Sequence, residues 1–206
     1  MITLNEYLAD PCGMLSIPYW KAKQIQIPEQ MQILHDREFD PQLLLEHEDT
    51  VYFRLLHDFR RIPALSSGNF RILTAAESDC KTIANIINAS YPDIQTSQAK
   101  IKEMTQTCVY APSLWLLAVD ESTGKPLGCA IADFDPEAEE LIIEWLQVLP
   151  EYRRRGIAAA LVLELLRRRP ETAKFATVSG KEPSALALYR MCGFRGFDFW
   201  HVMTKK

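Results

Sequence analysis

The pattern of apolar and polar positions along the chain becomes regular at about residue 69. From there on, apolar runs of strand length alternate with segments whose apolar residues recur at helical spacing. The predicted strands are 70–75, 114–121, 126–134, 140–149, 174–180 and 197–203. The predicted helices are 76–91 with Ser78 as a cap, 97–107, 157–169 and 183–192. This alternation predicts an α/β domain over residues 69–206.

The first 68 residues follow a less regular pattern. Residues 3–9 are predicted to form a short helix and 33–39 a strand, whereas the apolar run in 51–59 fits either a strand or a short helix. Pro63, Ser66, Ser67 and Gly68 form a turn-rich cluster that predicts a connector. Residues 1–68 are therefore interpreted as an N-terminal α+β extension, and whether it packs on the main domain stays open.

Composition indicates a soluble globular protein, with 48% apolar and 24% charged residues among 206. The net charge of -4 belongs to residues 1–68, which hold 6 basic and 10 acidic residues, whereas residues 69–206 hold 17 of each. A domain without excess positive charge argues against nucleic-acid binding. The chain offers no long apolar run and no basic leader, so we expect a cytoplasmic protein without a membrane partner.

Cysteine and histidine spacing argues against a disulfide-stabilised protein and against a zinc-binding protein. The 5 cysteines are odd in number and form no CxxC pair, which is typical of reduced thiols rather than a disulfide framework. The 4 histidines follow no zinc-binding spacing. We therefore expect no metal site.

The stretch that indicates chemistry is a predicted strand, the turn 150–156 and a predicted helix. The N-terminus of a helix presents free amides and partial positive charge, which suit a phosphate group. Gly156 allows the backbone to approach an anion closely. Small residues follow at Ala158 and Ala159, and the arginines 153–155 add donors. A pyrophosphate is a suitable ligand for this turn.

Arg153, Gly156 and Ala158 resemble the acetyl-CoA signature of the GNAT acetyltransferase superfamily, Arg/Gln-x-x-Gly-x-Gly/Ala. A second block, from Ala185 through Leu188 and Tyr189 to Gly193-Phe194, is similar to the family's C-terminal helix. The resemblance covers residues 69–206. It implies a mixed, largely antiparallel sheet with splayed central strands flanked by helices.

The resemblance also implies the positions of acetyl-CoA and of the residues that bind it. The backbone of Leu146, Gln147 and Val148 would pair with the pantetheine arm. The signature turn would hold the pyrophosphate, through Arg153, Arg154, Arg155, Gly156, Ile157, Ala158 and Ala159. Tyr189 would lie beside the sulfur and protonate the leaving thiolate. One departure is Glu182, where many relatives carry Asn; a carboxylate there either repels acetyl-CoA or binds an amine.

The acetyl transfer to an amine that the resemblance implies needs a carboxylate to take the proton of the attacking amine. Glu144 is the favoured residue, because regular alternation would place it on one face of its strand with Leu146. Glu140, Asp133 and Asp135 are alternatives that could line the same cleft.

These observations predict an N-acetyltransferase that moves an acetyl group from acetyl-CoA directly to a primary amine on a small molecule or peptide. The alternative is a non-catalytic acyl-CoA-binding sensor or scaffold. Residues 1–68 and 75–113 are expected to choose the acceptor, and the acidic extension would favour a cationic one. A homodimer stays an open alternative.

Overall fold

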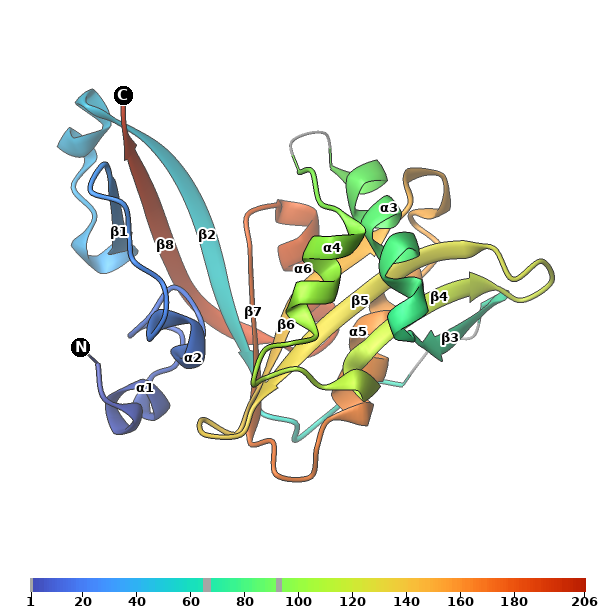
Figure 1. Ribbon diagram of the computed structural model, residues 1–206. Coiled ribbons are helices and arrows are strands. Elements are labelled where there is room, and N and C mark those ends of the chain that lie inside the picture. The colour runs from blue at the N-terminus through green and yellow to red at the C-terminus, as the bar shows by residue number, and fades with distance from the viewer. Residues whose placement is uncertain (1, 65–67, 92–93) are drawn as a thin grey trace.

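The computed structural model describes residues 2–64, 68–91 and 94–206, and its strands form one mixed sheet in the order β1-β8-β2-β7-β6-β5-β4-β3 (Figure 1). The strands are β1 (Met31–His35), β2 (His47–His57), β3 (Phe70–Thr74), β4 (Trp115–Asp120), β5 (Pro126–Asp135), β6 (Glu140–Val148), β7 (Phe175–Gly180) and β8 (Arg195–Lys205). The β6–β7 pair is parallel and the other pairs are antiparallel. The expected GNAT-like sheet is thus confirmed.

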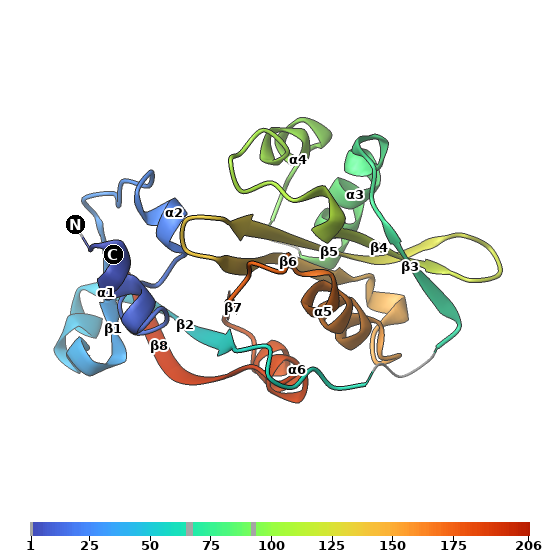
Figure 2. The ribbon, with the colours of Figure 1, turned by 90° about the horizontal axis from the view of Figure 1, so that it is seen from below.

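Helices cover both faces of the sheet (Figure 2). The helices are α1 (Leu4–Ala9), α2 (Tyr19–Ala22), α3 (Cys80–Ser90), α4 (Gln98–Met104), α5 (Ile157–Arg168) and α6 (Pro183–Met191). Ile83 and Ile101, from α3 and α4, pack on Trp115 and Ile131 of the sheet. The larger core on the opposite face packs α5 and α6 against residues such as Leu141. Burial of these two apolar faces supplies the main driving force for folding.

Most predicted elements form within two residues of their expected ends, but two expectations are wrong. The strand expected over 33–39 ends at His35, because the ring of His35 accepts a hydrogen bond from the Arg37 amide at 3.1 Å and starts a 3-10 turn. Ser78 does not cap α3; a 3-10 turn precedes the helix, and the Asp79 carboxylate accepts from the Ala76 amide at 2.8 Å. Of the run 51–59, residues 51–57 belong to strand β2, which ends at His57. Ser66 and Ser67 of the expected connector lie outside the described residues.

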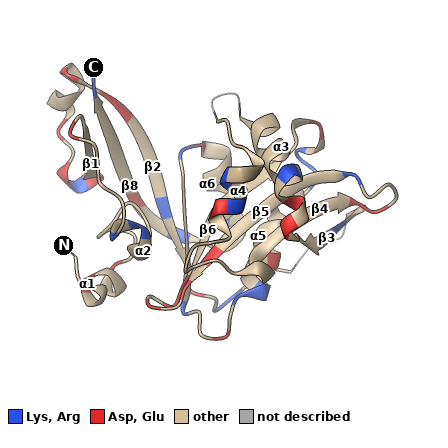
Figure 3. Cartoon of the chain, in the orientation of Figure 1, with Lys and Arg blue, Asp and Glu red and all other residues tan. Residues whose placement is uncertain are grey.

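Residues 1–68 contribute two strands to the same sheet as the rest of the chain. β2 lies between β7 and β8 and pairs with both, while β1 pairs with β8. α2 carries basic residues close to the acidic turn between β5 and β6 (Figure 3), where Lys23 forms an ion pair with Glu137. The extension therefore builds the wall beside the central strands β6 and β7.

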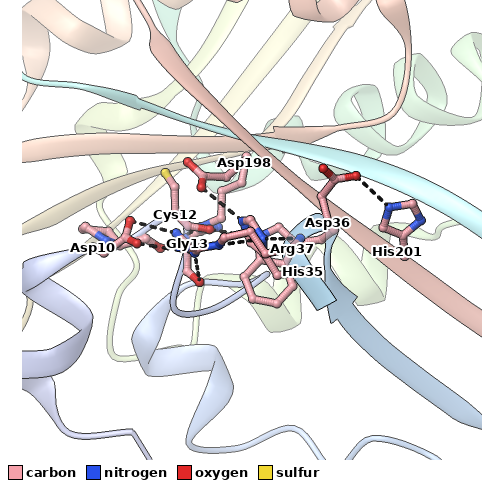
Figure 4. Close-up of polar contacts among 11 residues, drawn as sticks. Asp10, Cys12, Gly13, His35, Asp36, Arg37, Asp198 and His201 are labelled. Atoms are coloured by element: carbon pink, nitrogen blue, oxygen red, sulfur yellow. Dashed lines mark hydrogen bonds and ion pairs between the residues drawn. The ribbon is translucent and has the colours of Figure 1, made fainter. Parts of the chain in front are cut away.

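The coil after α1 is held on this sheet through three successive backbone carbonyls. Arg54 donates to the Pro11 carbonyl at 3.2 Å, the Trp200 indole to that of Cys12 at 2.8 Å, and Arg37 to that of Gly13 at 3.2 Å. Around the last of these contacts, His35 hydrogen bonds Asp198 and His201 lies near Asp36 (Figure 4). These contacts position the coil that leads into α2.

A buried ion pair joins the extension to the central strands. Arg54 of β2 and Glu140 of β6 are 1% and 0% exposed, and their nearest charged atoms lie 3.3 Å apart. The Tyr7 hydroxyl donates to Glu140 at 2.7 Å and accepts from Arg54 at 2.9 Å, and the Thr177 hydroxyl also bonds Glu140. Burial raises the pKa of Glu140, against the lowering effect of Arg54. Each charge of the pair is thus balanced by its partner and also hydrogen-bonded to a neighbouring hydroxyl.

We expect Arg54→Met to lower the free energy of unfolding by about 3–5 kcal/mol, because it leaves the Glu140 carboxylate buried without a counter-charge. Urea unfolding measures the change. Arg60→Met is the matched control, since Arg60 pairs with Asp58 at an exposed position. Equal effects of the two substitutions would contradict the role of Arg54 as the counter-charge of Glu140. Adding Glu140→Met to Arg54→Met should restore most of the lost stability, because it removes the unpaired charge.

Candidate active site

The two central parallel strands separate halfway along their length. Pairing between β6 and β7 runs from Glu140–Phe175 to Ile143–Val178. From Glu144 to Val148, β6 has no partner on its β7 side within the described residues, whereas β2 pairs with the other edge of β7 from Ala176 to Gly180. The separation leaves a strand edge whose backbone groups are available to an extended ligand.

The separation coincides with a β-bulge at Glu144. Ile131 of β5 faces Trp145, and the next residue, Ala132, faces Ile143, so Glu144 is the extra residue of β6. The expectation that Glu144 shares a face with Leu146 is wrong, because the bulge breaks the alternation. Leu146 packs toward α5 and α6. Glu144 lies beside Ile142, and its side chain bonds Lys21 of α2.

The turn after β6 leads directly into α5. Gly156 is the residue before α5 and has a φ of 78°, a left-handed conformation that favours glycine. The first backbone bond of the helix runs from the Ala160 amide to the Gly156 carbonyl at 3.0 Å. The amides of Ile157, Ala158 and Ala159 precede that bond and have no side-chain cap, so they remain donors for a ligand.

The three arginines of this turn have different contacts. Arg153 donates to the carbonyls of Val148 and Ser90, both at 3.1 Å, and so ties the turn to the end of β6 and to α3. Arg155 lies over the Tyr152 ring at 5.2 Å. Arg154 is exposed, with a φ of 64°. Arg153 thus holds the turn in place, and Arg154 and Arg155 supply positive charge at its surface.

The three β6 residues expected to pair with pantetheine lie at the unpaired edge. Leu146 is half-buried, and Gln147 and Val148 are buried. The Cys129 thiol lies 3.7 Å from the Gln147 side-chain oxygen. The Val148 carbonyl already accepts from Arg153, so the remaining backbone groups on the edge away from β5 are the ones available to a ligand.

Tyr189 projects from α6 into the core beside the separated strands. Its ring packs edge-on against Phe53 and Phe194, with centroids 6.2 and 5.6 Å away. Burial, with a smaller effect of Tyr91 at the end of α3, raises the pKa of Tyr189. Tyr189 is therefore protonated at neutral pH and can act as a proton donor. Glu182, just before α6, is exposed.

Glu140, one of the alternative proton acceptors, forms the buried ion pair with Arg54 described above. The favoured residue, Glu144, is bound by Lys21, whose ammonium lies 2.7 Å from each carboxylate oxygen. Local sequence offered no signal for Lys21, because its partner lies 123 positions away.

Asp133 is a buried carboxylate whose pKa the fold raises. It is 4% exposed, and one of its oxygens has no hydrogen-bond partner among the described residues. Burial, with a further effect of the Glu144 charge, raises its pKa to about 7. Asp135 is also buried, and its Oδ1 accepts from the Glu137 amide at 2.9 Å. Asp133 and Glu144 thus form a pair of interacting carboxylates at the separation of the strands.

The sequence model described as the acetyltransferase (GNAT) family matches residues 80–194, which is more than half of the chain. The chain belongs to this family. The matched range includes the signature turn, β6, β7 and α6, and it leaves out the extension. No curated protein sequence gives a significant match.

Solved structures of the same fold agree with this assignment. A GCN5-related N-acetyltransferase from Sphaerobacter thermophilus superposes with a TM-score of 0.68 at 19% identity, over 86% of this chain and 61% of that one. A conserved protein of unknown function from Staphylococcus epidermidis gives 0.63 at 15% identity, over 100% and 82%. A GCN5-related N-acetyltransferase from Kribbella flavida gives 0.60 at 14%, over 85% and 67%. The chain therefore spans about three-fifths of the Sphaerobacter protein.

The described residues add neither a membrane-spanning helix nor a metal site to this picture. None of the described helices combines the length and apolar character needed to cross a membrane. No group of three or more His, Cys, Asp or Glu among those residues is arranged to hold a metal ion. All five cysteines are free thiols.

We expect Asp133→Asn to stabilise the protein more at pH 8 than at pH 5. The fold raises the pKa of Asp133 from 3.8 to about 7, so the folded state binds a proton that the unfolded state releases between these values. Wild-type stability therefore falls as pH rises through this window. The variant lacks this loss, which amounts to a few kcal/mol at about 1.4 kcal/mol per pKa unit.

Urea unfolding at the two pH values measures this difference. Asp120→Asn is the control, because hydrogen bonds from Ser122 and Thr123 lower the pKa of Asp120 to about 2, and its effect should be constant between pH 5 and 8. A constant effect of Asp133→Asn as well would contradict the raised pKa.

Proposed function

We propose that this protein is an N-acetyltransferase that moves an acetyl group from acetyl-CoA to a primary amine by direct transfer. The observation that carries the proposal is the separation of β6 from β7 at Glu144, with the free amides of α5 at the far end of β6. A strand edge and an anion site in one line suit a ligand with an extended arm and a pyrophosphate. Membership of the GNAT family supports the same ligand.

The residues present fit acetyl-CoA. The edge of Leu146, Gln147 and Val148 would hold the pantetheine arm, and the amides from Arg154 to Ala159 would hold the pyrophosphate. Bound acetyl-CoA supplies an acetyl thioester. The chain supplies a carboxylate pair, Asp133 and Glu144, that accepts the ammonium proton of the acceptor, and Tyr189, which donates a proton to the departing sulfur. Holding both reactants in one site supplies much of the rate.

Two measurements test the proposed activity. Acetyl-CoA at about 100 times its Kd should stabilise the protein by about 2.7 kcal/mol, seen as a rise in Tm. Free thiol should then appear when a panel of primary amines is added. Stabilisation without thiol release from any amine would favour the non-catalytic sensor instead. Absence of stabilisation would contradict both functions.

We expect Tyr189→Phe to lower kcat by roughly 100-fold, because it removes a proton donor while keeping the ring that packs on Phe53. The KM for acetyl-CoA should change little. Steady-state thiol release measures both constants. Tyr110→Phe is the matched control, since Tyr110 packs on Trp115 under the α3–α4 layer. An unchanged kcat in Tyr189→Phe would remove Tyr189 from the reaction.

A further inference from the structure

A partly open cavity of about 230 Å³ lies at the point where β6 and β7 separate. Its floor is the sheet, with Ile142 and Glu144 of β6 on one side and Trp200 and Val202 of β8 on the other. Its roof is the coil Ser16–Pro18 and Lys21 of α2. The extension, which the family match leaves out, therefore supplies the roof, and it adds Ile33, Tyr52 and Arg54 to the floor.

The roof is positioned by the contacts that hold the preceding coil. Arg54, Trp200 and Arg37 bind the carbonyls of residues 11–13, and the chain then crosses the sheet to α2. Lys21 closes the cavity on the Glu144 side, with its ammonium 2.7 Å from both carboxylate oxygens. Its side chain is 28% exposed, so its flexible stem has room to turn toward solvent.

We infer that this cavity binds the acceptor, and that the acceptor is a small primary amine whose ammonium replaces that of Lys21 on Glu144. The inference rests on the proposed function and adds the substrate class. A primary ammonium has the same charge and donors as the Lys21 side chain, so it can make the same bonds to Glu144. Ile17, Ile142 and Val202 would contact the apolar part of the amine.

The volume of the cavity limits the size of the acceptor. Pockets for drug-sized ligands measure roughly 300–1,000 Å³, and this one is smaller. The acceptor is therefore a compact alkyl or arylalkyl amine. Lys21 acts as a specificity-determining residue, because an acceptor that cannot displace its ammonium cannot reach Glu144.

Removing the competing ammonium should favour the acceptor. In Lys21→Met, Glu144 lacks a counter-charge until the amine binds. We expect the KM for 2-phenylethylamine at saturating acetyl-CoA to fall about fivefold, the size of a partly exposed ion pair. The KM for acetyl-CoA should stay unchanged. Lys23→Met, on the same segment but paired with Glu137 outside the cavity, should change none of these constants.

Filling the cavity should have the opposite effect. Val202→Phe adds bulk to the floor, and we expect the KM for 2-phenylethylamine to rise roughly tenfold or more, as steric changes in apolar pockets do. Val51→Phe is the matched control, since Val51 is a 40% exposed position on the neighbouring strand β2. The acetyl-CoA-induced rise in Tm in each variant shows that the fold and the first binding site remain intact.

The outcomes separate this inference from the proposed function. Thiol release with 2-phenylethylamine, together with a lower KM in Lys21→Met and a higher KM in Val202→Phe, supports the acceptor site. Thiol release with unchanged amine KM values in both variants overturns it and leaves the acetyltransferase activity standing. Higher kcat/KM for a lysine-containing peptide than for 2-phenylethylamine overturns it too. Absence of thiol release with every amine overturns both.

Discussion

The rest of the structure depends on a buried charge that must be compensated. Glu140 lies at the start of β6, with no exposed surface, at the first residue pair between β6 and β7. Arg54 compensates it from β2, and Tyr7 from α1 bonds both groups. Breaking a pair of this kind costs more than its formation contributes. Detaching the extension would leave Glu140 as an uncompensated buried charge, and this free-energy cost holds the extension against the central strands in addition to its backbone pairing.

This constraint places the parts of the active site. β2 lies against the end of β7, and β6 is left with a free edge beyond Ile143. The same Arg54 holds the coil that leads to α2, and α2 delivers Lys21 to Glu144. One buried side chain thus connects the edge proposed for acetyl-CoA with the roof of the cavity proposed for the acceptor.

Local sequence predicted the elements and the turn before α5 well, because both depend on short-range physics. Alternation and helical spacing are set by burial of one face of each element, and Gly156 before an apolar helix specifies a turn with free amides. The face of Glu144 could not be predicted, since the bulge arises from how β5 and β6 pair rather than from any residue type at that position. The raised pKa of Asp133 likewise depends on burial by distant segments.

The sequence by itself determined the order of strands and helices over residues 69–206, the family resemblance and the two motif blocks, because each is encoded by residues close together in the chain. Only the tertiary structure decided that β2 inserts between β7 and β8, that Glu140 is paired with Arg54, and that Lys21 forms an ion pair with Glu144. The Arg54–Glu140 pair joins residues 86 positions apart, and the Lys21–Glu144 pair joins residues 123 positions apart. Strand pairing and charge compensation at such separations are chosen by the global packing of the sheet, which no local pattern contains.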